Sequence, residues 1–181
     1  MKRLLSKGRI GGAVLVSALL LTLAPMPANA HTFGGHFPHS TGSWVYLGWT
    51  SSGAYYDSAQ AATSNWHYTP TLLWVFPEAY ATSEIDFYGY DYNATWWGYS
   101  VNHPCYGTGC TYTWADEQLN TGTLASETAF TRQKVATHEM GHGMGLAHNT
   151  DWWYTSIMKQ GYLSYNTPQN HDINDINALY P

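Results

Sequence analysis

Three histidines within eleven residues constrain this chain more than any other feature of its sequence. Residues 138–148 read His-Glu-Met-Gly-His-Gly-Met-Gly-Leu-Ala-His. In a helix, residues i and i+4 lie on one face, so His138 and His142 can direct their imidazoles toward a single point. Glu139 is rotated from that face by about 100 degrees. Its carboxylate is therefore expected beside that point and not on it.

The third histidine lies beyond the helix that the first two require. Gly145 tolerates the positive φ at which helices commonly end, so the chain can turn there and return His148 to the same point. Three neutral imidazoles suit zinc and leave a fourth coordination position open, as in catalytic zinc sites. Unrelated core histidines would be a simpler explanation, but the whole motif on a predicted helix favours zinc. We predict that His138, His142 and His148 bind one catalytic Zn²⁺, with Glu139 as general base for a zinc-activated water.

A methionine follows the third histidine at a spacing that indicates a second role. Met158 ends the sequence Thr-Ser-Ile-Met over residues 155–158 and lies ten residues after His148. A single methionine is more often a filler of the hydrophobic core. After this zinc motif, a methionine in a tight turn beneath the metal is expected. We therefore assign Met158 to a Met-turn.

Residues 1–30 have the composition of a leader. Four basic residues come first, Lys2, Arg3, Lys7 and Arg9, and an apolar run over residues 10–23 follows them. Ala28-Asn29-Ala30 then resembles a cleavage site. This pattern is typical of a secretory signal peptide. A membrane anchor is the alternative, but the run is shorter than the ~20 residues that a spanning helix needs. We expect cleavage after Ala30, one domain over residues 31–181, and a secreted, extracellular protein that no longer contacts the membrane.

Removal of the leader would make the chain strongly acidic. After residue 30 the chain has three basic residues, Arg132, Lys134 and Lys159, and twelve Asp and Glu, which gives a formal charge of −9. Such a chain lacks the electrostatic footprint of a nucleic-acid or anionic-lipid partner. The excess of carboxylates is compatible with bound Ca²⁺ but indicates it only weakly.

The two cysteines lie close together, as Cys105 and Cys110. In an exported protein, such a pair is most simply a disulfide. A metal site of His103 with both cysteines is the alternative, but it has no apparent fourth ligand.

Aromatic residues are abundant, with nine Trp, fifteen Tyr and five Phe. They could fill a core or form a platform for flat ligands such as sugars. The core is favoured, because no regular spacing picks out an exposed face.

The pattern of apolar residues predicts strands mixed with three helices, an α+β domain. Residues 31–43 are expected to form an extended arm and residues 93–109 a loop. Expected strands cover residues 44–49, 71–76, 84–90 and, at a sheet edge, 111–119. Expected helices cover residues 57–66 with Asp57 as N-cap, 126–143 with Ser126 as N-cap, and 170–180.

Over residues 31–181 the sequence resembles the catalytic domain of a matrixin-type metzincin. Residues 65–72, Asn-Trp-His-Tyr-Thr-Pro-Thr-Leu, resemble the end of the family's first helix. Residues 138–148 match its elongated zinc motif, and residues 170–180 resemble its last helix, which ends in Leu-Tyr. The resemblance implies a twisted mixed sheet with two long helices above a small C-terminal part that ends in a helix. It also implies a zinc metalloendopeptidase that cleaves extended protein or peptide substrates, and we expect a monomer.

The sequence departs from the family pattern at several positions. No cysteine lies between the leader and the domain, so we expect no cysteine-switch latency. Asn149 follows the third histidine where animal matrixins usually carry Ser or Thr, and His67 and His103 do not make the structural zinc site of those enzymes. Gln160 is not Tyr, so the extra tyrosine ligand of astacins is not expected.

Two other functions remain possible from the sequence. A binding module could keep the fold without turnover, although the intact Glu139 argues against it. A metallohydrolase of different specificity, such as an exopeptidase, is the second alternative.

Overall fold

The part of the chain that can be described combines one sheet with four helices. A computed structural model describes residues 31–38, 43–50, 53–78, 83–105 and 107–181, so the leader and its cleavage site lie outside it. The strands are β1 (Ser43–Trp49), β2 (Val75–Glu78), β3 (Ile85–Tyr90), β4 (Gly98–His103) and β5 (Trp114–Asn120). The helices are α1 (Gly53–His67), α2 (Thr121–Leu124), α3 (Ala129–Gly143) and α4 (Asn170–Leu179). The predicted α+β class with a mixed sheet is confirmed.

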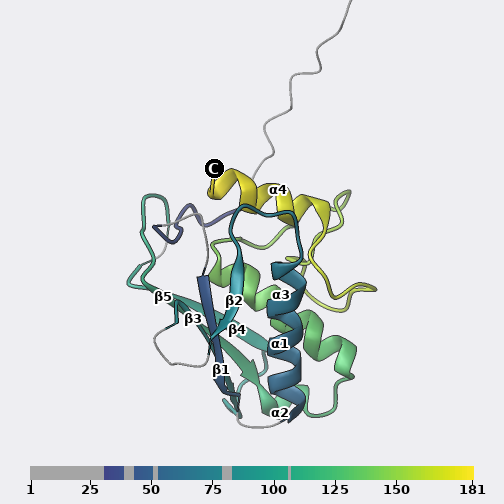
Figure 1. The fold of residues 1–181 in the computed structure, drawn as a ribbon. Coiled ribbons are helices and arrows are strands. Elements are labelled where there is room, and N and C mark those ends of the chain that lie inside the picture. Colours follow the sequence, from purple (N-terminus) through teal and green to yellow (C-terminus); the bar gives the residue numbers. More distant parts are fainter. Residues whose placement is uncertain (1–30, 39–42, 51–52, 79–82, 106) are drawn as a thin grey trace, which may run out of the picture.

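The sheet has the strand order β2-β1-β3-β5-β4, in which only β4 runs antiparallel to its neighbour. Helices α1 and α3 lie side by side along it, whereas α4 lies apart at the other end of the molecule (Figure 1). The described residues include no helix with the length and apolarity that crossing a bilayer requires. The fold thus packs α3, which carries the first two histidines, against both the sheet and α1.

The expectation of a loop over residues 93–109 is wrong, because Gly98–His103 within it form strand β4. Its side chains alternate between buried and more exposed positions, but the buried ones belong to Ser100 and Asn102. Because these residues are polar, the strand shows no apolar alternation in the sequence. β4 pairs with β5 and covers its outer side, so the prediction that residues 111–119 form an edge strand is also wrong.

The expected strand over residues 71–76 was placed too early. Only Val75–Glu78 pairs with β1, because the preceding segment bonds elsewhere. The Leu72 backbone N–H donates to the Asn177 side chain at 2.7 Å, and the Thr71 hydroxyl donates to the Leu73 carbonyl at 3.0 Å. The segment before β2 therefore contacts α4 in place of the sheet.

Both expected N-caps are wrong, while all three expected helices form. α1 begins at Gly53, so Asp57 lies inside it and is exposed. α3 begins after Thr128, whose hydroxyl accepts the Thr131 N–H at 3.1 Å, so Ser126 does not cap it. Threonine is also a favoured N-cap residue, and its hydroxyl here accepts the N–H three residues ahead.

The core lies between the sheet and the two long helices. Trp66 of α1 is almost fully buried, and its indole N–H donates to the Thr137 carbonyl of α3 at 3.0 Å. Buried alanines let the helices approach the sheet closely. The buried side chains between the sheet and these helices include Val45, Ala59, Ala62, Ile85, Phe87, Ala115, Val135, Ala136 and Met140. This packing fixes α3, and with it the helical half of the histidine motif.

The predicted disulfide between Cys105 and Cys110 is confirmed, with an S–S distance of 1.99 Å. The alternative metal site is not formed, because His103 pairs with Asp116 at 3.0 Å and stacks on Trp114. The Cys110 carbonyl accepts the His36 N–H at 3.1 Å, so the disulfide loop is bound to the N-terminal arm.

Candidate active site

The last two turns of α3 bring the first two histidines together. His138 and His142 are 4% and 7% exposed, and their ring centroids lie 4.7 Å apart. This is the arrangement that the i, i+4 spacing predicts.

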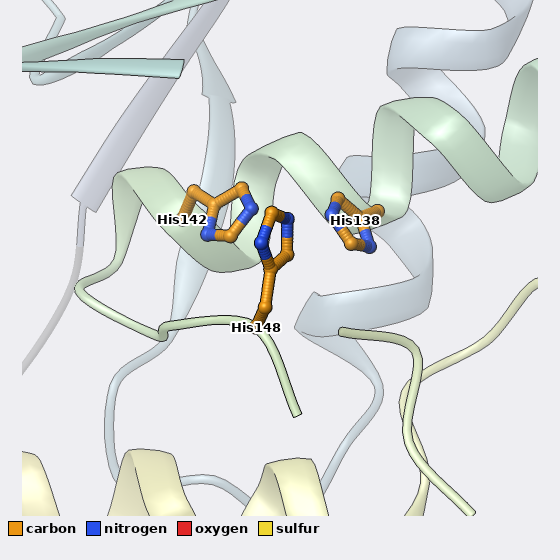
Figure 2. A group of neighbouring side chains, drawn as sticks. All are labelled: His138, His142 and His148. Atoms are coloured by element: carbon orange, nitrogen blue, oxygen red, sulfur yellow. The ribbon is translucent and has the colours of Figure 1, made fainter. Parts of the chain in front are cut away.

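A sharp turn after α3 returns the third histidine. Gly145 has φ 102°, and an added Cβ there would lie 2.5 Å from the Gly35 carbonyl oxygen, so only glycine fits. The ring of His148 then lies 4.6 Å from that of His142 and 5.2 Å from that of His138. One ring nitrogen from each histidine lies within 4.8 Å of the other two. Figure 2 shows the His148 ring rising from the loop between the two helical rings.

Backbone carbonyls orient the two helical histidines. His138 Nδ1 lies 2.7 Å from the Ile157 carbonyl oxygen, and His142 Nδ1 lies 2.7 Å from the Leu146 carbonyl oxygen. A carbonyl only accepts, so each Nδ1 carries the proton and each Nε2 has its lone pair free. Metal-binding histidines are commonly oriented in this way.

The surroundings keep the imidazoles neutral. Burial lowers the pKa of His142 to about 4, and burial together with the neighbouring His142 lowers the pKa of His138 well below its ordinary value. Burial also lowers the pKa of His148. Three neutral nitrogens at one point form a donor set that fits zinc and leaves a fourth position open.

Glu139 lies beside this cluster and does not belong to it. It is 7% exposed, and burial raises its pKa to about 8 against the opposing charge of Lys134. A Cβ added at Gly98 of β4 would lie 2.5 Å from Glu139 Oε1. The absence of a side chain at Gly98 therefore leaves room for the carboxylate beside β4.

A cavity of about 680 Å³ joins these groups. One wall is formed by the residues before and in β4, and the other by α3. The lining residues are Phe33, Thr95, Trp96, Trp97, Gly98, Tyr99, Ser100, Lys134, Val135, His138, Glu139, His142, His148, Gln160 and Gly161. The histidine cluster and Glu139 thus line the same cavity as residues of β4.

The family model of the matrixins matches residues 55–181. The chain belongs to the matrixin family. Matrixins are zinc-dependent metalloendopeptidases, which confirms the enzyme class expected from the sequence. No individual curated protein matches the chain at a significant level.

In this matrixin, Met158 lies directly beneath α3. It is almost fully buried, and a Cβ added at Gly141 would collide with its sulfur atom. The Met158 carbonyl accepts the Asn149 N–H at 3.1 Å, which links the turn to the residue after His148. Met158 thus packs against the helix that bears His138 and His142, while its assignment to a Met-turn stays a prediction.

The buried carboxylate of Asp172 holds this turn from the first turn of α4. It accepts the Ile157 N–H at 2.8 Å, the Gln169 N–H at 2.7 Å and the Ser156 hydroxyl. Burial nevertheless raises the pKa of Asp172. Asp172 thus links the turn that contains Met158 to α4.

Sequence reasoning missed several residues of the cleft. The whole of β4 was missed, and so was Asn102, which donates to the His142 carbonyl at 3.0 Å at the end of α3. Lys134 is buried, its ammonium donates to the Lys159 carbonyl at 3.1 Å, and burial lowers its pKa to about 8. Lys134 precedes His138 by four residues, so the helical spacing that identified the histidines could also have placed it at the cleft.

Proposed function

We propose that this matrixin is a secreted endopeptidase in which His138, His142 and His148 bind the catalytic zinc and Glu139 is the general base. The observation that carries the proposal is the convergence of three neutral imidazoles beside a carboxylate on the wall of one cavity. The same constellation supports Met158 as the Met-turn methionine, because it packs beneath the helix that bears two of the ligands.

The chemistry divides between the ion and the chain. Zinc at this site supplies a Lewis acid that polarises the scissile carbonyl and lowers the pKa of a water. Glu139 accepts the proton of the attacking water at its carboxylate and delivers it to the leaving amine. Burial favours the protonated form of Glu139, and Lys134 opposes this by favouring the carboxylate. Lys134 therefore helps to keep Glu139 in the carboxylate form that accepts the proton.

Substrate binding is assigned to the cavity side of β4. β4 ends the order of the described strands, and Gly98, Tyr99 and Ser100 line the cavity. An extended peptide can pair with such an edge through its main chain, which gives affinity without strict sequence preference. This arrangement favours cleavage within a chain.

A casein or gelatin assay tests the function. We expect internal cleavage that a chelator abolishes and added Zn²⁺ restores. Mass spectrometry of the products separates the alternatives, because an exopeptidase would release only terminal residues. A binding module would release nothing with or without the chelator.

Secretion rests on the leader alone, and its test is independent of catalysis. We expect the exported protein to begin at His31, which N-terminal sequencing or intact mass would establish. A retained leader in the culture medium would contradict this part of the proposal.

A further inference from the structure

A second group of metal-binding side chains lies where the N-terminal arm meets α4. His31 Nδ1 lies 2.9 Å from His171 Nε2. Asp175 Oδ2 lies 3.3 Å from His171 Nε2 and 3.9 Å from His31 Nδ1. The described residues contain one other group of this kind, the histidines of the active site.

The three separations match the bond lengths of a small divalent ion. Three atoms at these distances lie on a circle with a radius of about 2.0 Å, and zinc binds histidine nitrogen and carboxylate oxygen at about 2.0–2.2 Å. An ion at or just out of the plane of the three atoms would therefore reach all of them without any movement of the chain. Two imidazoles and one carboxylate are also a donor set typical of zinc.

The charge and hydrogen bonds of the group favour a cation. Asp175 is 3% exposed, and its Oδ1 is buried with no hydrogen-bond partner in the part of the chain that the structure describes. Its other oxygen, Oδ2, accepts the His31 backbone N–H at 3.1 Å. A buried carboxylate of this kind is costly unless a positive charge compensates it.

The histidines are held in orientations that suit coordination. The Tyr154 ring stacks on His171 with centroids 4.2 Å apart. His31 Nε2 lies 3.5 Å from Asp151 Oδ2, on the side of the ring opposite to the cluster. A carboxylate on that side of the ring favours the tautomer in which Nε2 carries the proton and Nδ1 faces the cluster.

We propose that His31, His171 and Asp175 form a second transition-metal site, separate from the active site and suited to Zn²⁺. The site joins two segments that are far apart in sequence, because 140 residues separate the two histidines.

The ion would stabilise the lower half of the active site, which is the segment after α3 that carries His148. The Ala147 N–H donates to the His31 carbonyl at 2.6 Å, and the Phe33 N–H donates to the Gly145 carbonyl at 2.9 Å. These bonds hold the arm against the segment that leads to His148. A metal that binds both the arm and α4 therefore stabilises that segment without contact with the substrate.

Zinc content measures the two sites separately. The purified exported protein is equilibrated with micromolar Zn²⁺, gel-filtered and analysed by plasma mass spectrometry. We expect about two zinc ions per chain in the wild type. Asp175→Asn and His171→Gln should each lose about one, His142→Ala should also lose about one, and Asp175→Asn combined with His142→Ala should retain none. His103→Gln is the matched control, because His103 pairs with a single carboxylate, and it should retain both.

Each outcome decides one site. Loss of one zinc in Asp175→Asn but not in His142→Ala would support the second site and contradict the catalytic one. One zinc in the wild type with no loss in Asp175→Asn would overturn the second site and leave the group as an ion-pair cluster of histidines and aspartates.

A melting experiment covers the case in which the second-site variants fail to fold. His142→Ala keeps the second site intact and is melted with Zn²⁺ or with Mg²⁺, which prefers oxygen ligands. Zinc at about 100 times its Kd should raise the Tm by roughly 5–10 °C, and Mg²⁺ should not. An equal Tm with and without zinc would overturn the proposal.

Discussion

The two halves of the active site are held in different ways. His138 and His142 lie on α3, which is packed against the sheet and α1, and their orientation follows from one helical repeat. His148 lies on irregular chain whose position depends on the arm, the Met-turn and Asp172. The helical half is therefore local in sequence, and the lower half is assembled from distant segments. Four predictions test this difference.

The largest effect is expected from loss of a ligand in either half. His138→Ala and His148→Ala should each lose about one zinc per chain and fall below detectable proteolysis, because both halves are required to hold the ion. Zinc analysis and a casein assay measure this. Full activity in either variant would refute the assignment of that histidine.

Glu139→Gln separates chemistry from metal binding. Glutamine has nearly the same shape but cannot accept a proton, so kcat should fall about 10²–10⁴-fold, or roughly 3–5 kcal/mol of transition-state stabilisation. Zinc content should stay unchanged, and KM should change little, because an extended peptide is bound mainly away from Glu139. Retention of more than about a tenth of wild-type kcat would mean that another base operates.

Asp172→Ala tests the lower half alone. Three donors lose their buried acceptor, and each unsatisfied group costs about 1–3 kcal/mol, so even the lower value for each gives a loss of roughly 3 kcal/mol of stability. Zinc affinity should fall with it, while far-UV circular dichroism stays unchanged. Asp57→Ala, on the exposed face of α1, is the control and should change neither property. Equal melting temperatures for the two variants would show that the Met-turn does not need α4.

Gly98→Ala makes the smallest change, because Gly98 lies on β4 and acts on the helical half only through contact with Glu139. The added methyl group would overlap the Glu139 carboxylate, and a displacement of about 1 Å can reduce the rate on the order of 10²-fold. We expect kcat to fall by up to that factor with zinc and stability retained. Gly53→Ala, where an added Cβ meets nothing within 4 Å, should leave kcat unchanged. Unchanged kcat in Gly98→Ala would mean that Glu139 moves freely in the cavity.

The same division explains what the sequence could predict. The three helices, the histidine cluster and the disulfide follow from local spacing, and the structure has them where expected. β4 was missed because its buried positions are Ser100 and Asn102, so the position of β5 inside the sheet was missed as well. The second histidine cluster could not be found from spacing, because its members come together only through the fold. Calcium binding stays a prediction.

The N-terminal arm contacts residues that lie far from it in the sequence, and this has a consequence for the folding rate. The Tyr180 hydroxyl accepts the Phe37 N–H at 3.2 Å across 143 residues and donates to the Met144 carbonyl at the end of α3. Contacts between such distant residues form slowly, because the entropy of closing a long loop has to be lost before they contribute. Helix α3 and its neighbours in the sheet need no such closure. We therefore expect the chain to acquire most of its secondary structure before His148 reaches its place, so that proteolytic activity is among the last properties to appear on refolding.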